Sequence, residues 1–190
     1  MTPHHVLSLS WLTWVASWIA GSFWAAPTQK KAGWAAERPF RIQMIVGALL
    51  LFVGSALKGY GAARLWPDDA RLGWLLVAVA VIGFAFTWWA RLHLGPLWSA
   101  GVQKKEGHRL VDTGPYGIVR HPIYTGVLAA LGAMAALIGT PLALMGFAVM
   151  VWGFWTKARL EERFLSVEIG AEAYAAYARR VPMLLPFGPH

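Results

Sequence analysis

The residues best suited to chemistry lie in two polar stretches, 108–126 and 157–182, which flank a long apolar run. The first stretch reads HRLVDTGPYGIVRHPIYTG and contains two His, two Arg, one Asp and two Tyr. The second begins at Lys157 and adds the adjacent carboxylates of Glu161 and Glu162. Charged groups beside a membrane are costly unless they are paired or hydrated. Their clustering therefore predicts a binding or catalytic site at a membrane boundary.

The sequence does not support several common kinds of site. The chain has no Cys, which excludes disulfides, thiolate catalysis and Cys-ligated zinc. His108 and His121 have no His or Glu partner at the spacing of zinc or di-iron sites, so no metal is expected. A dinucleotide fingerprint, a P-loop and a nucleophile elbow are also missing from the sequence.

The composition indicates an integral membrane protein. The chain of 190 residues is 57% hydrophobic and 14% charged, whereas soluble domains average about 45–50% apolar and about 25% charged residues. The net charge of +8 is interpreted as the Lys and Arg excess of cytoplasmic loops. No compact basic run alternates with aromatic residues outside the apolar segments, so no nucleic-acid partner is expected. Membrane lipids are the expected surroundings.

Five apolar segments are predicted to cross the membrane as helices. They cover residues 6–26, 42–57, 72–94, 122–138 and 142–155. The first is interpreted as a retained helix and not as a signal peptide, because no Lys or Arg precedes it. Gly47 and Gly54 in the second segment favour close contact with another helix. The fifth segment continues as a polar helix through Glu162, and a short amphipathic helix is expected at 168–180.

The predicted fold class is therefore an all-α, polytopic membrane protein with about five transmembrane helices. Residues 1–94 hold three spans, and residues 95–190 hold the site together with a helical hairpin at 122–157. Lys and Arg concentrate in the loops after the first and third spans and in the C-terminal tail. Because such residues mark cytoplasmic loops, we expect a multi-pass protein of the cell membrane whose two polar stretches face the cytoplasm.

The hairpin explains why the two polar stretches should meet. Both of its helices rise about 1.5 Å per residue, so positions equidistant from the turn near residue 140 lie at similar depth. Arg120 and His121 should then lie near Glu161, while Tyr124 lies one turn deeper. Taken singly, Arg120 and Lys157 are also explained as cations that extend from helix ends toward water. The hypothesis of a site depends on the whole constellation.

The same residues carry a resemblance to a known family. The segment GPYGIVRHPIYTG at 114–126, the pair Glu161–Glu162 and the segment YAAYARRVP at 174–182 resemble the isoprenylcysteine carboxyl methyltransferase family. The resemblance covers about residues 91–187. These motifs are shared with related membrane methyltransferases, including phospholipid N-methyltransferases, and more loosely with sterol reductases.

The resemblance implies an enzyme that binds S-adenosyl-L-methionine, the methyl donor, in a pocket that is not a Rossmann fold. Carried over by position, the donor-binding residues, with the neighbouring Glu162 added, are Gln103, His108, Arg109, Leu110, Val111, Tyr116, His121, Pro122, Ile123, Tyr124, Glu161 and Glu162.

The resemblance also implies that the acceptor is the carboxylate of a C-terminal isoprenylcysteine whose lipophilic tail enters from the bilayer. The expected catalytic residues are Lys157 and Arg120, two cations that hold the carboxylate. Lys157 occupies the position at which the family's eukaryotic members carry Arg, and Lys lacks the bidentate geometry of Arg. A phospholipid amine, with Glu162 as proton acceptor, or a small thiol remains an alternative acceptor. A nicotinamide-dependent membrane reductase and a non-catalytic scaffold are alternative functions.

Overall fold

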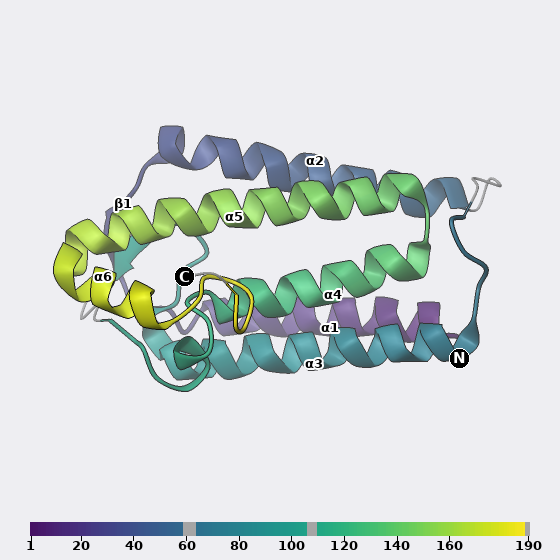
Figure 1. Ribbon diagram of the computed structural model, residues 1–190, viewed down its shortest axis with the longest axis horizontal. Helices are drawn as coiled ribbons and strands as arrows, with labels where there is room; N and C mark the ends of the chain where they lie inside the picture. The colour runs from purple at the N-terminus through teal and green to yellow at the C-terminus, as the bar shows by residue number, and fades with distance from the viewer. Residues whose placement is uncertain (59–63, 106–109, 189–190) are drawn as a thin grey trace.

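The computed structural model describes residues 1–58, 64–105 and 110–188, and these are mostly helical. The long helices lie side by side along one axis (Figure 1). They are α1 (Pro3–Ser22), α2 (Trp34–Lys58), α3 (Ala70–Leu94), α4 (Pro122–Ile138) and α5 (Pro141–Ile169), followed by the short α6 (Ala171–Arg180). The predicted class of an all-α membrane protein is confirmed. Segments of α2, α3 and α5 are long and apolar enough to cross a membrane, and α4 is a shorter apolar helix.

The helix boundaries follow the apolar segments most closely where the helix ends are marked by Pro and Gly. The fourth helix spans Pro122–Ile138, as predicted, with Pro at its first position and Gly139 in a left-handed conformation after its end. By contrast, α2 begins at Trp34, eight residues before the predicted apolar segment, and includes Pro39. The fifth helix is continuous to Ile169, so it carries Lys157 and Glu161 on one rigid element.

The bundle consists of closely packed helix pairs, with α2 along α5, and α3 along α4 with α1 against α3 (Figure 1). A Cβ added at Gly126 would lie 2.5 Å from the carbonyl oxygen of Gly83, so α3 and α4 approach each other where no side chain intervenes. The close contact predicted at Gly47 and Gly54 is confirmed. Added Cβ atoms there would lie 3.0 Å from Gly146 O and 2.8 Å from the Ala143 nitrogen.

A small antiparallel sheet joins two loops that are distant in sequence. Strand β1 (Thr28–Lys31) pairs with β2 (Gln103–Lys105), with Thr28 opposite Lys105 and Lys31 opposite Gln103. Both strands are short and rich in Lys, without the alternating apolar pattern that identifies a strand, so the sequence analysis missed them. Two 3₁₀ turns were also missed, η1 (Gly95–Leu97) and η2 (Gly114–Gly117).

A buried arginine joins α1 to α3 at this same end of the bundle. The Arg91 guanidinium donates from Nη1 to Gly95 O at 2.6 Å and from Nη2 to Gly21 O at 2.7 Å. These carbonyls lie at the C-terminal ends of the two helices, where the helix dipole is negative. The Arg91 guanidinium carbon also lies 4.6 Å from the Trp98 ring centroid. Arg91 is therefore stabilised by carbonyl and aromatic groups, and it fixes where α1 and α3 end.

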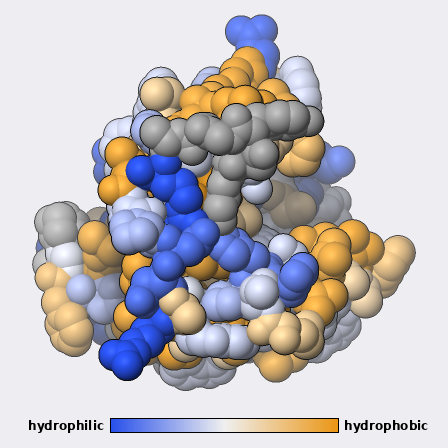
Figure 2. Space-filling model, turned by 90° about the vertical axis from the view of Figure 1, so that its right-hand side faces the viewer, coloured by the Kyte–Doolittle hydropathy of each residue, from blue (hydrophilic) through white to orange (hydrophobic). Residues whose placement is uncertain are grey.

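The opposite end of the bundle contains the N-terminus and the turn between α4 and α5 (Figure 1). The Arg64 guanidinium donates to Leu137 O at 3.3 Å, and the Trp66 indole donates to Ala136 O at 3.1 Å. The two side chains therefore satisfy the last carbonyls of α4. Figure 2 looks onto this end, where hydrophilic residues cross the middle of the face and hydrophobic residues flank them.

Candidate functional site

The start of α4 is fixed by the segment that follows α6. The backbone N–H of Arg120 donates to Pro182 O at 2.8 Å, and that of His121 donates to Met183 O at 3.1 Å. The Thr125 hydroxyl adds a bond to Leu184 O at 2.6 Å. Residues 182–184 thus hold the first turn of α4 in place, and the side chains of Arg120 and His121 are both buried.

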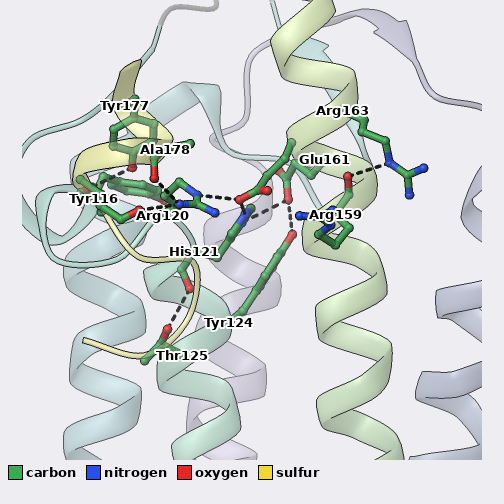
Figure 3. A network of polar contacts seen from close by, with 12 residues as sticks. Tyr116, Arg120, His121, Tyr124, Thr125, Arg159, Glu161, Arg163, Tyr177 and Ala178 are labelled. Carbon is green, nitrogen blue, oxygen red and sulfur yellow. Dashed lines mark hydrogen bonds and ion pairs between the residues drawn. The ribbon is translucent and has the colours of Figure 1, made fainter. Parts of the chain in front are cut away.

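Facing side chains of α4 and α5 form a polar cluster at the cavity. The Tyr124 hydroxyl donates to a carboxylate oxygen of Glu161, and His121 Nδ1 lies 3.8 Å from the same oxygen. His121 Nε2 lies 3.2 Å from Glu162 Oε1. The His121 and Tyr124 rings stack at 5.1 Å with nearly parallel planes. Figure 3 shows both rings directed from α4 toward the carboxylates on α5, so the hairpin brings together the groups that its geometry predicted.

Arg120 uses its guanidinium to join three segments. Its Nε donates to Glu162 Oε1 at 2.7 Å, and its Nη1 donates to Ala178 O at 2.9 Å and to Val181 O (Figure 3). The two carbonyls belong to the C-terminal end of α6 and the residue after it. Glu162 is consequently shared between Arg120 and His121. This arrangement holds α6 against the α4–α5 hairpin.

Three buried tyrosines form the wall between α6 and the η2 turn. The Tyr177 hydroxyl donates to Tyr116 O at 2.7 Å, and the rings of Tyr174 and Tyr177 pack edge to face at 6.0 Å. Burial raises the pKa of Tyr116, Tyr174 and Tyr177 well above that of an exposed phenol. The three phenols therefore stay protonated at neutral pH and can donate hydrogen bonds.

A cavity lies between these elements. Ten of the predicted site residues line it: Gln103, Leu110, Val111, Tyr116, Arg120, His121, Pro122, Ile123, Tyr124 and Glu161. Seven further residues that the sequence analysis did not select also line it: Leu94, Leu97, Trp98, Ser99, Leu165, Tyr174 and Tyr177. Leu165 lies four residues after Glu161, a helical spacing that could have identified it. The cavity combines an apolar wall with one carboxylate, one guanidinium, one imidazole and several phenols.

The comparison with known families concerns the part of the chain that builds this cavity. Residues 75–167 match the model of the isoprenylcysteine carboxyl methyltransferase (ICMT) family. This region is similar to the ICMT family. It contains the His121–Tyr124 turn, Lys157 and both carboxylates, and it ends before Tyr174 and Tyr177.

Curated relatives carry names that agree with the ICMT match. Protein-S-isoprenylcysteine O-methyltransferase B of Arabidopsis thaliana is 37% identical over 87 residues, which are 45% of this chain and 44% of that protein. The protein-S-isoprenylcysteine O-methyltransferase of Xenopus laevis is 31% identical over 128 residues, 65% of this chain and 44% of that protein. The human protein of the same name is 30% identical over 127 residues, 64% of this chain and 45% of that protein. The chain thus matches less than half the length of these relatives.

Within the ICMT region, Lys157 lies beside the cavity and does not line it. Its ammonium donates to Ala100 O at 2.8 Å and lies 5.1 Å from the centroid of the Tyr124 ring. Glu162 likewise does not line the cavity, because it contacts Arg120 and His121. His108 and Arg109 lie outside the described residues. Among the described residues, no group of three His, Asp or Glu could hold a metal ion.

Proposed function

We propose that this protein is an S-adenosyl-L-methionine-dependent methyltransferase of the membrane. The observation that carries the proposal is the His121–Tyr124–Glu161 cluster, which borders a cavity at one end of a membrane helix bundle, inside the region of the ICMT match. The lining suits this methyl donor, because a carboxylate and aromatic rings favour a sulfonium cation. When bound, the donor would supply an electrophilic methyl group.

The proposed acceptor is the C-terminal carboxylate of an isoprenylated cysteine, which accords with the names of the relatives. In the reaction, an acceptor oxygen forms a bond to the methyl carbon while the bond from that carbon to sulfur breaks. The acceptor is already ionised, so no general base is required. Catalysis then depends on placing the two partners in line and on excluding water.

The contacts of the two candidate cations favour different roles for them. Arg120 is held by Glu162 and by two carbonyls near the end of α6, so we assign it to positioning. Lys157 uses one N–H for Ala100 O, which leaves two donors on its ammonium for an acceptor carboxylate. We therefore propose Lys157 as the group that binds the acceptor. The predicted roles of His108 and Arg109 in donor binding remain predictions.

The geometry disfavours the alternative of an amine acceptor. Such an acceptor requires a proton acceptor near the nucleophile, and Glu162 was the candidate. Glu162 Oε1 already accepts from Arg120 Nε at 2.7 Å and lies 3.2 Å from His121 Nε2, so this carboxylate is engaged with two side chains. We also propose that the end of the bundle with the site faces the cytoplasm and that the membrane is the cell membrane. The basic residues Lys30, Arg38, Lys104 and Arg163 support this orientation.

Two measurements on detergent-purified protein test the proposal. Calorimetry should show saturable binding of S-adenosyl-L-homocysteine to the wild type, and binding should be lost in His121→Ala and retained in Glu172→Ala, a change on the exposed side of α6. Labelled donor should transfer its methyl group to N-acetyl-S-farnesylcysteine and not to the same compound with its carboxylate blocked. Folded wild type that does not bind the donor product would overturn the methyltransferase assignment. Transfer only to a phospholipid amine would overturn the acceptor assignment.

A further inference from the structure

A buried carboxylate on α2 contacts the segment that lies against Lys157. The side chain of Glu37 is buried, with Oε1 accepting the backbone N–H of Val102 at 2.8 Å. Its Oε2 accepts from Arg41 Nε at 2.9 Å, which balances its charge. Glu37 lies before the ICMT match and outside both polar stretches.

The segment from Ser99 to Gln103 fits closely around this carboxylate. A Cβ added at Gly101 would lie 3.0 Å from Glu37 Oε1, so glycine lets the backbone approach the carboxylate. Val102 is fully buried, and its carbonyl accepts the backbone N–H of Ala32 at 2.9 Å. Ser99 and Gln103 line the cavity at the two ends of this segment. Glu37 therefore holds one wall of the site.

The same segment determines where the ammonium of Lys157 lies. Lys157 Nζ donates to Ala100 O, two residues before the N–H that Glu37 binds. Nζ also lies 5.6 Å from the centroid of Phe40, a buried ring one turn after Glu37 on α2. On the cavity side, Nζ lies 5.1 Å from the centroid of Tyr124. One carbonyl and two ring faces thus surround the ammonium of a flexible side chain.

We propose that Glu37 and Phe40 of α2 are positioning residues that hold Lys157 for the acceptor carboxylate. This inference rests on the proposed function of Lys157. A lysine has a flexible four-carbon side chain and lacks the planar, preorganised donors of arginine. Glu37 and Phe40 restrict the flexible Lys157 side chain, whereas the donors of an arginine are already held rigidly by its planar guanidinium. Glu37 fixes Ala100 O through Val102, and Phe40 limits the space beside Nζ.

Kinetics on the whole 190-residue chain separate a positioning role from a general structural one. Glu37→Ala should raise the KM for N-acetyl-S-farnesylcysteine about tenfold, the effect of losing roughly one buried hydrogen bond to a charged group. The Kd for S-adenosyl-L-homocysteine should change less than about twofold, because the proposed donor cluster of His121, Tyr124 and Glu161 lies on α4 and α5 and is not hydrogen-bonded to Glu37. Glu37→Gln keeps an oxygen for the Val102 N–H, so its KM for the acceptor should lie close to the wild-type value. Gly101→Ala should raise KM as well, because its methyl group pushes against Glu37 Oε1.

A double-mutant cycle tests whether Glu37 acts through Lys157. In a Lys157→Met background, Glu37→Ala should change the acceptor KM by less than about twofold. A full tenfold effect in that background would overturn the inference, as would an equal loss of donor affinity in Glu37→Ala. Glu172→Ala serves as the matched removal of an exposed carboxylate and should leave both constants unchanged.

A measurement independent of turnover keeps the inference separate from the proposed function. Acylation of Lys157 by an acetyl ester, followed by peptide mass spectrometry, should become several-fold faster in Glu37→Ala and stay unchanged in Glu172→Ala. Equal rates in all three proteins would overturn the positioning role. Failure of the wild type to bind the donor product or transfer methyl groups, with the acylation difference intact, would instead overturn the proposed function.

Discussion

At the end of the bundle that carries the N-terminus, polar side chains bind the ends of nearby helices; at the opposite end, they also bind the carboxylates of α5 beside a cavity. Arg64 and Trp66 satisfy the last carbonyls of α4. Arg120 does the same for the end of α6, but it also bonds to Glu162, which in turn contacts His121. Both ends therefore contain capping interactions, and among the described residues those at the site end are the ones coupled to a carboxylate cluster.

This difference shows which charged residues point to function in a membrane protein. An arginine at a helix end is explained by the carbonyls it satisfies, as Arg64 and Arg91 show. Glu161 has no such explanation, because its carboxylate lies on the cavity and, among the described residues, accepts a hydrogen bond from only Tyr124. Among the described residues, a carboxylate that lines a cavity and can accept further hydrogen bonds is the feature that separates the two ends.

The largest effect is expected from neutralising the carboxylate at the cavity. Glu161→Gln should weaken binding of S-adenosyl-L-homocysteine roughly 100-fold, because hydrogen bonds to a charged group each contribute about 1.5–3 kcal/mol. At the other end, Asp69→Asn should leave binding unchanged, because Asn also caps the α3 N-terminus that Asp69 caps. Calorimetry measures the affinity of both variants for S-adenosyl-L-homocysteine. Equal affinities in the two variants would contradict the difference between the two ends of the bundle.

The next effect compares two arginines. Arg120→Met leaves two carbonyls without their arginine donor and leaves Glu162 with His121 alone, and removal of one member of a buried ion pair costs about 3–5 kcal/mol. Arg64→Met loses a hydrogen bond to Leu137 O and an ion pair with the exposed Asp68, at a cost of about 1 kcal/mol. Thermal unfolding in detergent should show the larger fall for Arg120→Met. A larger fall in unfolding temperature for Arg64→Met than for Arg120→Met would contradict this ranking of the two arginines.

Two threonines give a smaller, matched contrast. Thr125→Val removes the bond to Leu184 O and should weaken donor-product binding a few-fold, because the start of α4 loosens. Thr140→Val removes the cap of α5, which lowers stability by about 1 kcal/mol and leaves binding unchanged. Binding isotherms and unfolding temperatures, measured on both proteins, separate the two effects. Weaker donor-product binding in Thr140→Val, with unchanged binding in Thr125→Val, would contradict the assignment of Thr125 to the site.

The smallest expected effect is on the pH dependence of stability, and it appears only at high pH. Burial raises the pKa of Tyr174 and Tyr177 in the folded state, so their stabilising contribution is complete below the unfolded value of about 10. It is lost as the pH rises from there through the folded-state pKa, because the unfolded chain releases protons first. Unfolding temperatures measured from pH 8 to 11 should fall less steeply above about pH 10 in Tyr174→Phe than in the wild type. Parallel curves would contradict the role of burial.

The sequence predicted those parts of the site that depend on local periodicity. The α4–α5 hairpin follows from Pro122, Gly139 and two apolar runs, so the meeting of His121 with Glu161 could be expected from helix geometry alone. The β1–β2 pairing, the contact of Glu37 with Val102 and the bonds from residues 182–184 to α4 could not. These contacts join segments far apart in the chain, and the sequence of each segment does not indicate which other segment it contacts.

The bonds from Pro182 and Met183 to the start of α4 have a consequence for biosynthesis. The hairpin of α4 and α5 can enter the membrane while later residues are still being added to the chain. The first turn of α4, however, receives its backbone partners only after residues 182–184 have been translated. Completion of the site therefore depends on residues made after both helices of the hairpin, and a chain that ends before residue 182 would lack the backbone partners of Arg120 and His121.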